Sequence, residues 1–303
     1  MAFYDIIVMQ FSRCLMKINL KIAGITVTYL YNYNNYLQDK IDQYRIADND
    51  NTKYKLEVII SADIKKYSAV FRKVHNREYY FSNVLDVLCI FAPQDNTIII
   101  QQTVFDKIEN DIKIYLNSDF IDNLAAQEYI LSGVMFLDIA SREGCLPLHA
   151  SAISFNNDAL LFSAPSQTGK STQTRLWKER FPDEIRYIND DKPLLYEKDD
   201  KIYVAGTPFS GSSVLNENIV KPLKALFFLE QGKQNKLIRL EKNEVLPLFM
   251  KNIMRPKEKE IWDKMFFVIE KIIDRIPIYL FFSTPDLSAV KAVYQELYFG
   301  GKR

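Results

Sequence analysis

A loop between a predicted strand and a predicted helix constrains this chain more than any other stretch. Residues 159–163 are mostly apolar and predict the strand, and residues 171–181 carry an apolar helical face that ends at Pro182. The residues between them, 164–172, are Ala-Pro-Ser-Gln-Thr-Gly-Lys-Ser-Thr. In loops that end in Gly-Lys-Ser at a helix start, backbone N–H groups surround phosphate oxygens, the lysine binds the outer phosphates and the serine hydroxyl binds Mg²⁺. The stretch therefore predicts a nucleotide-binding loop.

The loop departs from the full pattern G-x-x-x-x-G-K-[ST] at one position, because Ala164 stands where the pattern has glycine. The alternative is an ordinary turn, and the flanking strand and helix favour the nucleotide-binding loop. We assign Lys170 to the outer phosphates and Ser171 to Mg²⁺. The residues expected to contact the nucleotide are Ser166, Gln167, Thr168, Gly169, Lys170, Ser171 and Thr172.

Length and composition indicate a globular chain of two domains. The 303 residues are 48% hydrophobic and include 18 tyrosines and 20 phenylalanines, which is ample material for buried cores. Lysine and arginine number 39 and aspartate and glutamate 38, so the overall charge favours neither nucleic acid nor an anionic membrane as a partner. Any binding of polyanions must be local.

The cysteines indicate a reducing compartment. Cys14, Cys89 and Cys145 are far apart and form no C-x-x-C, which fits neither a disulfide framework nor a zinc site. The stretch from Met1 to Met16 lacks the basic and apolar regions of a signal peptide. No run approaches the roughly 18 apolar residues that span a bilayer. We therefore expect a cytoplasmic protein without a membrane partner.

Residues 1–120 are predicted to form a mainly β unit. Apolar residues alternate from Lys17 to Tyr31, with a phase shift at Ala23-Gly24 that indicates two strands or one bulged strand. His75 stands alone and the carboxylates are scattered, so this unit shows no catalytic constellation. Further strands are predicted at residues 54–61, 78–81, 97–104 and 113–116.

The second part, residues 121–303, alternates helices and strands. A helix that is apolar almost all round is predicted from Ile121 to Glu143 and joins the two parts. The Gly/Ser/Pro-rich loop at 206–213 is either a connector or a substrate-facing loop. Additional strands are predicted at residues 194–196, 201–205, 223–230, 236–240 and 278–282, and additional helices at 245–254, 258–274 and 286–299.

Two features flank the loop in sequence. The run 146–155 and the strand before the loop are separated by a short turn and predict a β-hairpin, so the loop strand has an antiparallel partner and the sheet is mixed. After the helix, a strand at 184–188 ends in Asp190 and Asp191, about twenty residues beyond the loop. Two carboxylates at this place suit Mg²⁺ binding and a catalytic base. The alternative is a polar turn before Pro193.

Together, the strand bearing Leu148-His149-Ala150, the hairpin, the loop and Asp190-Asp191 resemble the catalytic domain of HPr kinase/phosphorylase, whose core is shared with phosphoenolpyruvate carboxykinase. The stretches 206–211 and 221–226 look like the shorter HPr-kinase-like proteins, some of which phosphorylate a serine in peptide precursors such as lasso peptides. The resemblance covers about residues 145–255. The glutamate-arginine-glycine-leucine-glycine stretch of true HPr kinases is missing, which argues against HPr itself as the acceptor.

This resemblance implies an α/β fold with a mixed-sheet P-loop core of the HPr kinase/phosphoenolpyruvate carboxykinase type, and the strand pattern of residues 1–120 predicts a β-rich N-terminal domain before it. It implies ATP and Mg²⁺ as cofactors. Either Asp190 or Asp191 is implied as the base and the other as a metal ligand with Ser171; we rank Asp191 first as the base because it lies at the exit of its strand. His149 is expected beside the phosphates, or else is a satisfied core histidine, and Arg255 is expected to neutralise the transferring phosphoryl group.

The combined expectation is a kinase that moves the γ-phosphate of ATP to a serine or threonine hydroxyl of a peptide or small protein. Residues 1–120 would recognise this acceptor and residues 121–303 would form the kinase domain. One alternative is a small-molecule kinase on the same core, and another is a nucleotide-sensing module without catalysis. A nucleic-acid partner is disfavoured, and whether the chain forms a homo-oligomer is left open.

Overall fold

The computed structural model describes residues 15–34, 36–48, 50–68, 71–211 and 213–299. Cys14 and nearly all of the stretch considered for a signal peptide lie outside these ranges. The other two cysteines, Cys89 and Cys145, are buried free thiols. Among the described helices, none combines the length and the apolar character that crossing a bilayer requires.

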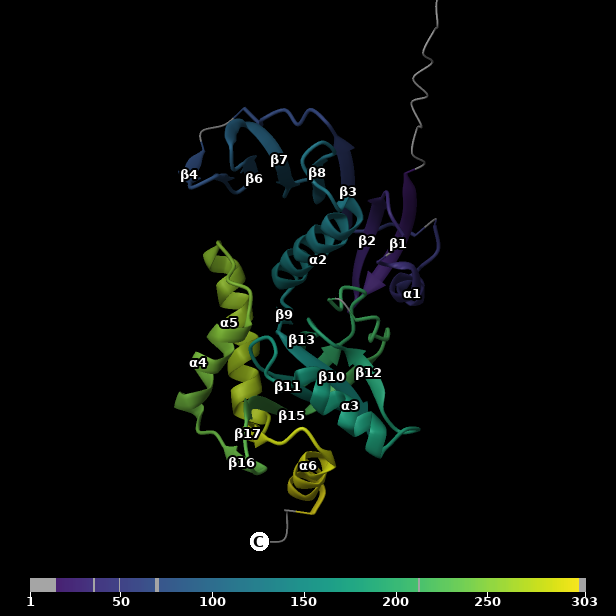
Figure 1. The fold of residues 1–303 in the computed structure, drawn as a ribbon, viewed down its shortest axis with the longest axis vertical. Helices are drawn as coiled ribbons and strands as arrows, with labels where there is room; N and C mark the ends of the chain where they lie inside the picture. The colour runs from purple at the N-terminus through teal and green to yellow at the C-terminus, as the bar shows by residue number, and fades with distance from the viewer. Residues whose placement is uncertain (1–14, 35, 49, 69–70, 212, 300–303) are drawn as a thin grey trace, which may run out of the picture.

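The N-terminal part is β-rich, as predicted, and forms an eight-stranded sheet in the order β1-β2-β3-β8-β7-β6-β5-β4 (Figure 1). β3 runs parallel to both β2 and β8. Ala23 and Gly24 form a tight turn with φ of 51° and 86°, so the predicted phase shift separates two strands. The elements are β1 Met16–Ile22, β2 Ile25–Tyr31, α1 Gln38–Ile41, η1 Asp42–Tyr44, β3 Tyr54–Ser61, β4 Arg72–Val74, β5 Arg77–Phe81, β6 Leu85–Ala92, β7 Asp95–Asp106 and β8 Asp111–Asn117.

The strand β6 was not predicted, although its side chains alternate in burial. Val87, Cys89 and Phe91 are buried. The intervening Leu88 and Ile90 are half-buried and also apolar, so the segment lacks the apolar–polar alternation that marks a strand in a sequence. Because both faces of the strand carry apolar side chains, the sequence shows no alternating pattern there.

The helix α2, Leu124–Arg142, lies between the two sheets (Figure 1). It begins later than predicted because the Asn123 side chain accepts a hydrogen bond from the backbone N–H of Ala126 (3.0 Å) and caps it. Its buried face shares one core with the N-terminal strands and with Leu194 and Phe209 of the second part. The helix therefore packs against both parts of the chain.

The second part contains a nine-stranded mixed sheet, which confirms the predicted mixed α/β class. β11 is antiparallel to β10 but parallel to β15, and β15 is parallel to β17. The elements are β9 Leu146–Pro147, β10 Ala150–Phe155, β11 Asp158–Ser163, α3 Lys170–Arg180, β12 Arg186–Asn189, β13 Leu194–Lys198, β14 Lys201–Ala205, β15 Val220–Gln231, β16 Lys236–Arg239, α4 Lys242–Asn252, α5 Lys259–Arg275, β17 Ile278–Ser283 and α6 Leu287–Phe299.

Helices cover both faces of this sheet, and β11 shows why its sequence is a continuous apolar run. Leu161 contributes to the core beneath α4 and α5, whereas Leu160 and Phe162 contribute to the core beneath α3 and α6. Since successive side chains of a strand point to opposite faces, every position between two covered faces must be apolar. The loop that follows β11 is thus anchored on a fully buried strand.

Candidate functional site

The strand β10 brings three predicted site segments to one edge of the sheet. It pairs antiparallel with β11 on one side, with Ala150 opposite Ser163, and with β12 on the other, with Ala152 opposite Asn189. β11 and β12 therefore run in the same direction, and their carboxyl ends meet at the start of β10. The 164–172 loop follows β11, the acidic pair follows β12 and His149 precedes β10. The predicted strand 146–155 is split into β9 and β10, which leaves His149 in the gap between them.

The 164–172 loop has a conformation that explains its departure from the glycine pattern. Within this loop, positive φ occurs at Gln167 (66°) and Gly169 (115°) but not at Ala164. Alanine in place of glycine therefore costs no backbone strain at the first position. α3 begins at Lys170, and no side chain caps its N-terminus. Its first N–H groups lack partners within the helix and form the positive end of the helix dipole, an arrangement that attracts anions.

Lys170 lies inside the loop rather than in solvent. Its ammonium group donates to the carbonyl oxygens of Ala164 (2.8 Å) and Pro165 (3.2 Å), and the residue is only 8% exposed. Burial lowers the pKa of Lys170, the charge of Asp191 and more weakly that of Asp190 oppose this shift, and Lys192 adds to it. The loop lysine and the acidic pair therefore share one electrostatic neighbourhood.

The remaining predicted phosphate contacts are accessible. Ser166, Gln167 and Ser171 are exposed, and Thr168, Gly169 and Thr172 are half-buried. The loop borders a cavity of about 340 Å³ whose opposite wall includes Phe228, Leu248 and Asn252. The carbonyl oxygen of the Asn252 side chain is buried and has no hydrogen-bond partner among the described residues. An unsatisfied polar atom in such a wall fits a site that binds a polar ligand.

The acidic pair contacts His149, which was expected beside the phosphates, and side chains that the sequence did not single out. The Ser151 hydroxyl donates to Asp190 Oδ1 (2.7 Å). Asp191 Oδ1 lies 3.0 Å from Lys192 Nζ and 3.4 Å from His149 Nε2. The side-chain oxygen Oδ1 of Asn189 accepts hydrogen bonds from the backbone N–H groups of Asp191 (2.9 Å) and Lys192 (2.7 Å), so a local turn sets the direction in which the acidic side chains leave β12.

His149 is half-buried and fixed through its backbone. Its N–H donates to the carbonyl of Asn252 (2.8 Å), and its own carbonyl accepts from the Ser163 hydroxyl (2.9 Å). Burial lowers the pKa of His149 to about 4, with further lowering by the charges of Lys192 and Lys170 and partial opposition from Asp191. The imidazole is therefore neutral at pH 7 beside the acidic pair.

Gly211 of the Gly/Ser/Pro-rich loop lies against Asp191. A Cβ added at Gly211 would lie 3.3 Å from the Asp191 carboxylate. The Gly211 carbonyl accepts from Lys40 Nζ (3.1 Å), and the Tyr129 hydroxyl accepts from Ser210 N (3.0 Å). Lys40 belongs to α1 and Tyr129 to α2, so elements distant in sequence from Asp191 contact the loop beside it. No local pattern distinguishes Lys40 in the sequence, because only its tertiary contacts are special.

Arg255 does not line the cavity beside the 164–172 loop, and the predicted metal ligands are few. Arg255 is exposed and lines a separate cavity of about 200 Å³ between β6, β7, α2 and residues 254–258. Its role at the phosphoryl group stays a prediction. The described residues contain no group of three or more histidine, cysteine, aspartate or glutamate side chains arranged to hold a metal ion. The predicted ligands, the Ser171 hydroxyl and the Asp190 carboxylate, are the hard oxygen donors that Mg²⁺ prefers alongside water and phosphates.

The chain is similar to one family model, over its second part, and to solved structures. No curated protein matches the chain. Among solved structures, the HPr(Ser) kinase/phosphatase from Coxiella burnetii matches 51% of this chain and 99% of that chain, with 14% sequence identity and a TM-score of 0.28. A family model described as SynChlorMet cassette protein ScmC matches residues 124–282. Because that match spans more than half of the 303 residues, the chain belongs to the ScmC family.

Proposed function

We propose that this protein is an ATP- and Mg²⁺-dependent kinase that transfers the γ-phosphate to a serine or threonine hydroxyl of a peptide or small protein. The observation that carries the proposal is the position of Lys170, buried in the loop at the uncapped N-terminus of α3 and close enough to Asp190 and Asp191 for their charges to act on it. Phosphate binding and a candidate base thus lie within one site.

The roles follow from the positions of the side chains. Lys170 and the first N–H groups of α3 bind the β- and γ-phosphates. When bound through Ser171 and Asp190, Mg²⁺ would neutralise charge on the phosphate oxygens. The acceptor hydroxyl oxygen attacks the γ-phosphorus while its proton passes to the Asp191 carboxylate, and the bond from γ-phosphorus to the β–γ bridging oxygen breaks to leave ADP. Neutral His149 beside Asp191 orients that carboxylate without adding charge.

The division of labour between residues 1–120 and 121–303 is part of the proposal. The N-terminal unit reaches the site through Lys40, which contacts the 206–213 loop directly over Asp191. A unit that contacts the site but contributes none of its phosphate-binding residues is suited to presenting an acceptor. We therefore assign residues 1–120 to acceptor recognition and residues 121–303 to phosphoryl transfer.

The experiment measures transfer of label from γ-labelled ATP to a degenerate peptide library with a central serine or threonine. Asp191→Asn keeps the shape of the side chain but removes the proton acceptor, so the transfer rate should fall by roughly 10²- to 10⁴-fold with little change in ATP affinity. Asp190→Asn should instead weaken ATP and Mg²⁺ binding together, and excess Mg²⁺ should partly restore its rate.

Lys170→Ala is the control that should not bind ATP, because without the ammonium group no positive side chain of the loop balances the negative charge of the outer phosphates. ATP binding without any peptide labelling by the parent protein would favour the nucleotide-sensing module. Labelling at the parental rate by both aspartate variants would overturn the mechanism.

A further inference from the structure

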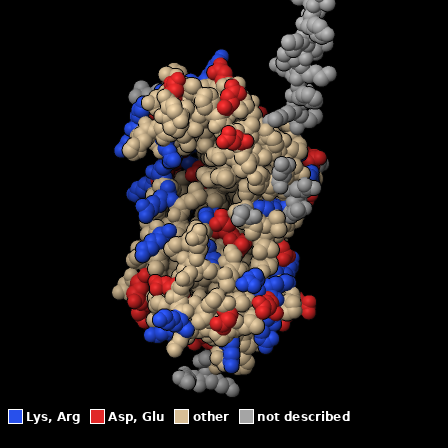
Figure 2. All heavy atoms as spheres, viewed as in Figure 1, with Lys and Arg blue, Asp and Glu red and all other residues tan. Residues whose placement is uncertain are grey.

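A second cavity lies between the N-terminal sheet and the rest of the molecule. Its volume is about 200 Å³, and its walls come from β6, β7, α2 and residues 254–258. Two of its apolar side chains are unusually exposed, Phe81 at 40% and Val134 at 42%. In Figure 2 the surface is hollowed between the upper and lower parts of the molecule, and basic side chains gather along the left rim. The cavity is therefore open to solvent, with apolar walls and a charged rim.

The size of the cavity selects the kind of group that enters it. Small-molecule and cofactor sites typically occupy about 300–1,000 Å³, and a cavity of about 150 Å³ already holds a benzene ring. A volume of about 200 Å³ is thus suited to one aromatic or large aliphatic side chain rather than to a nucleotide. The apolar walls supplied by Phe81, Leu131 and Val134 favour burial of such a side chain.

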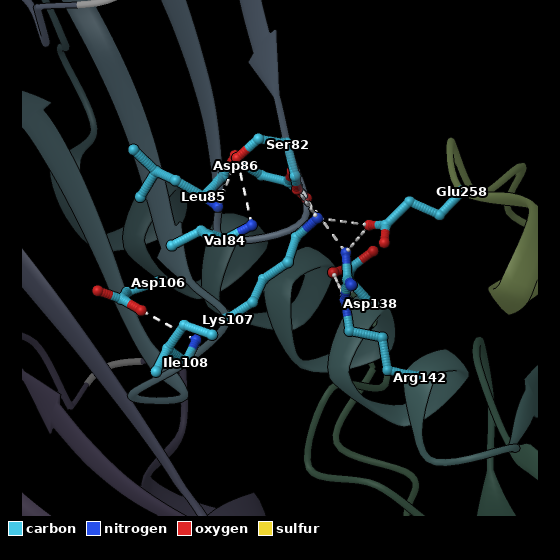
Figure 3. A network of polar contacts seen from close by, with 10 residues as sticks. All are labelled: Ser82, Val84, Leu85, Asp86, Asp106, Lys107, Ile108, Asp138, Arg142 and Glu258. Carbon is cyan, nitrogen blue, oxygen red and sulfur yellow. Dashed lines mark hydrogen bonds and ion pairs between the residues drawn. The ribbon is translucent and has the colours of Figure 1, made fainter.

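The charged side chains around the cavity form two sets, an ion-paired network and two cations outside that network. Figure 3 shows that Lys107 and Arg142 are paired with the carboxylates of Asp86 and Glu258, and Arg142 also with Asp138. The network holds three carboxylates and two cations, so it carries an excess of one negative charge.

Arg255 and Lys257 also line the cavity, and neither lies within ion-pair distance of an acidic side chain among the residues that the structure describes. Lys257 Nζ lies 4.0 Å from the centroid of the Phe81 ring, so an ammonium group stands directly beside the apolar wall. The carboxylates of Asp86, Asp138 and Glu258 also act on Lys257 from beyond ion-pair distance. Counted against Lys107, Arg142, Arg255 and Lys257, these three carboxylates leave an excess of one positive charge. A ligand that enters here is favoured if it carries an anionic group next to its apolar one.

The cavity is connected to the candidate site by a short stretch of chain. The Asn252 carbonyl accepts from His149 N (2.8 Å), Ile253 forms a β-bridge with Leu148, and Arg255 already lines the cavity. Three residues span at most about 11 Å, so a few residues of an extended peptide bridge the distance from the cavity to His149 and Asp191.

We propose that this cavity anchors the phosphate acceptor: an aromatic or large aliphatic side chain of an acceptor peptide enters between Phe81 and Val134, and a neighbouring carboxylate pairs with Arg255 and Lys257. The serine or threonine that receives the phosphate lies a few residues away along the peptide. This inference rests on the proposed function, since it names the class of acceptor that the site phosphorylates.

The test uses the capped pentapeptide acetyl-Glu-Phe-Gly-Gly-Ser-amide and measures its dissociation constant by ligand-observed NMR. Val134→Trp fills the cavity and should weaken peptide binding at least about tenfold, a loss expected when a central apolar anchor is excluded. Ile130→Trp is the matched control, because Ile130 is exposed on the same helix one turn earlier and does not line the cavity. It should bind the peptide as the parent does.

A second comparison isolates the charge and does not depend on the folding of Val134→Trp. Replacing glutamate by glutamine in the peptide should weaken binding to the parent about three- to tenfold, and Lys257→Gln should remove most of that difference. Failure of the parent to bind the peptide, or equal binding by Val134→Trp, would overturn the inference. ATP affinity is measured separately on the same proteins, so loss of the proposed kinase function and loss of this acceptor site give different results.

Discussion

The imidazole of His149 sits among charges that other residues bring to it. Lys192 and Lys170 disfavour its protonation, burial does so more strongly, and Asp191 only partly offsets them. A histidine that stays neutral in the folded protein but takes up a proton when unfolded makes folding depend on pH.

The first prediction is a loss of stability below neutral pH that depends on His149. The folded pKa is about 4 and the unfolded value is near 6.5, so between these values the unfolded state binds more protons and stability falls as pH falls. From pH 7 to pH 5 the free energy of unfolding should drop by up to about 2 kcal/mol through this group. Urea unfolding at both pH values should show a smaller drop for His149→Asn than for the parent protein.

His75→Asn is the matched control, since His75 lies on the exposed turn after β4. If the free energy of unfolding depended on pH equally in the parent protein and in His149→Asn, the protonation of His149 would not contribute to that dependence.

At the scale of elements, the joint between β11 and α3 depends on the backbone conformation of Gly169. Its φ of 115° is a conformation that residues with a side chain rarely adopt, although no atom lies within 4 Å of the place where a Cβ would stand. The requirement for glycine is therefore conformational and not one of space. This conformation allows the loop to turn into α3 with the first N–H groups of the helix facing the ligand.

The second prediction concerns Gly169→Ala. Forcing a residue with a Cβ into this φ should cost about 1–3 kcal/mol or shift the loop, so both the free energy of unfolding and the affinity for ATP should fall. Gly144→Ala is the matched control, because Gly144 also has positive φ (82°) and open space around it but follows α2, away from the loop. The control should lose similar stability and keep its ATP affinity, measured with a fluorescent ATP analogue. Equal ATP affinity in both variants would contradict the role given to the loop.

At the scale of the whole molecule, one polar network connects the N-terminal sheet, α2 and the segment before α5. Glu258 Oε1 lies 3.0 Å from Lys107 Nζ and 2.6 Å from the Arg142 guanidinium. Burial works to raise the pKa of Glu258, but these ion pairs outweigh burial and lower it. The side chains of Lys107 and Arg142 are only 10% and 15% exposed, so losing Glu258 leaves two poorly solvated cations that keep only Asp86 and Asp138 as ion-pair partners among the described residues.

The third prediction is that Glu258→Gln destabilises the fold by about 1–3 kcal/mol, between the values for exposed and buried ion pairs. Glu260→Gln provides the control two residues away, because the Glu260 side chain is 80% exposed and pairs only with Lys264 at 3.2 Å. Its effect should stay below about 1 kcal/mol. Urea unfolding followed by circular dichroism compares the two, and equal losses would show that the network does not join the parts energetically.

Local patterns in the sequence predicted most element types and the loop itself. The turn at Ala23-Gly24, the strand β3 and the helix α5 follow from alternation, helical periodicity and turn residues, all of which act over a few neighbouring positions. The mixed sheet was predictable because a tight hairpin before the loop forces an antiparallel partner onto β11. The candidate site residues of the loop and the acidic pair were identified for the same reason, since each occupies a short contiguous motif.

Contacts between distant segments decided the rest. Lys40 and Tyr129 meet the loop over Asp191, and Ser151 meets Asp190, only after the sheets and α2 have assembled. The strand β6 shows no alternation in its sequence because its half-buried face carries apolar side chains as its buried face does. The cavity that we assign to the acceptor is built from strands, a helix and a connecting segment more than a hundred residues apart. The sequence by itself determined which residues form the 164–172 loop and the acidic pair, whereas which side chains surround them depended on burial and charge pairing that exist only in the folded chain.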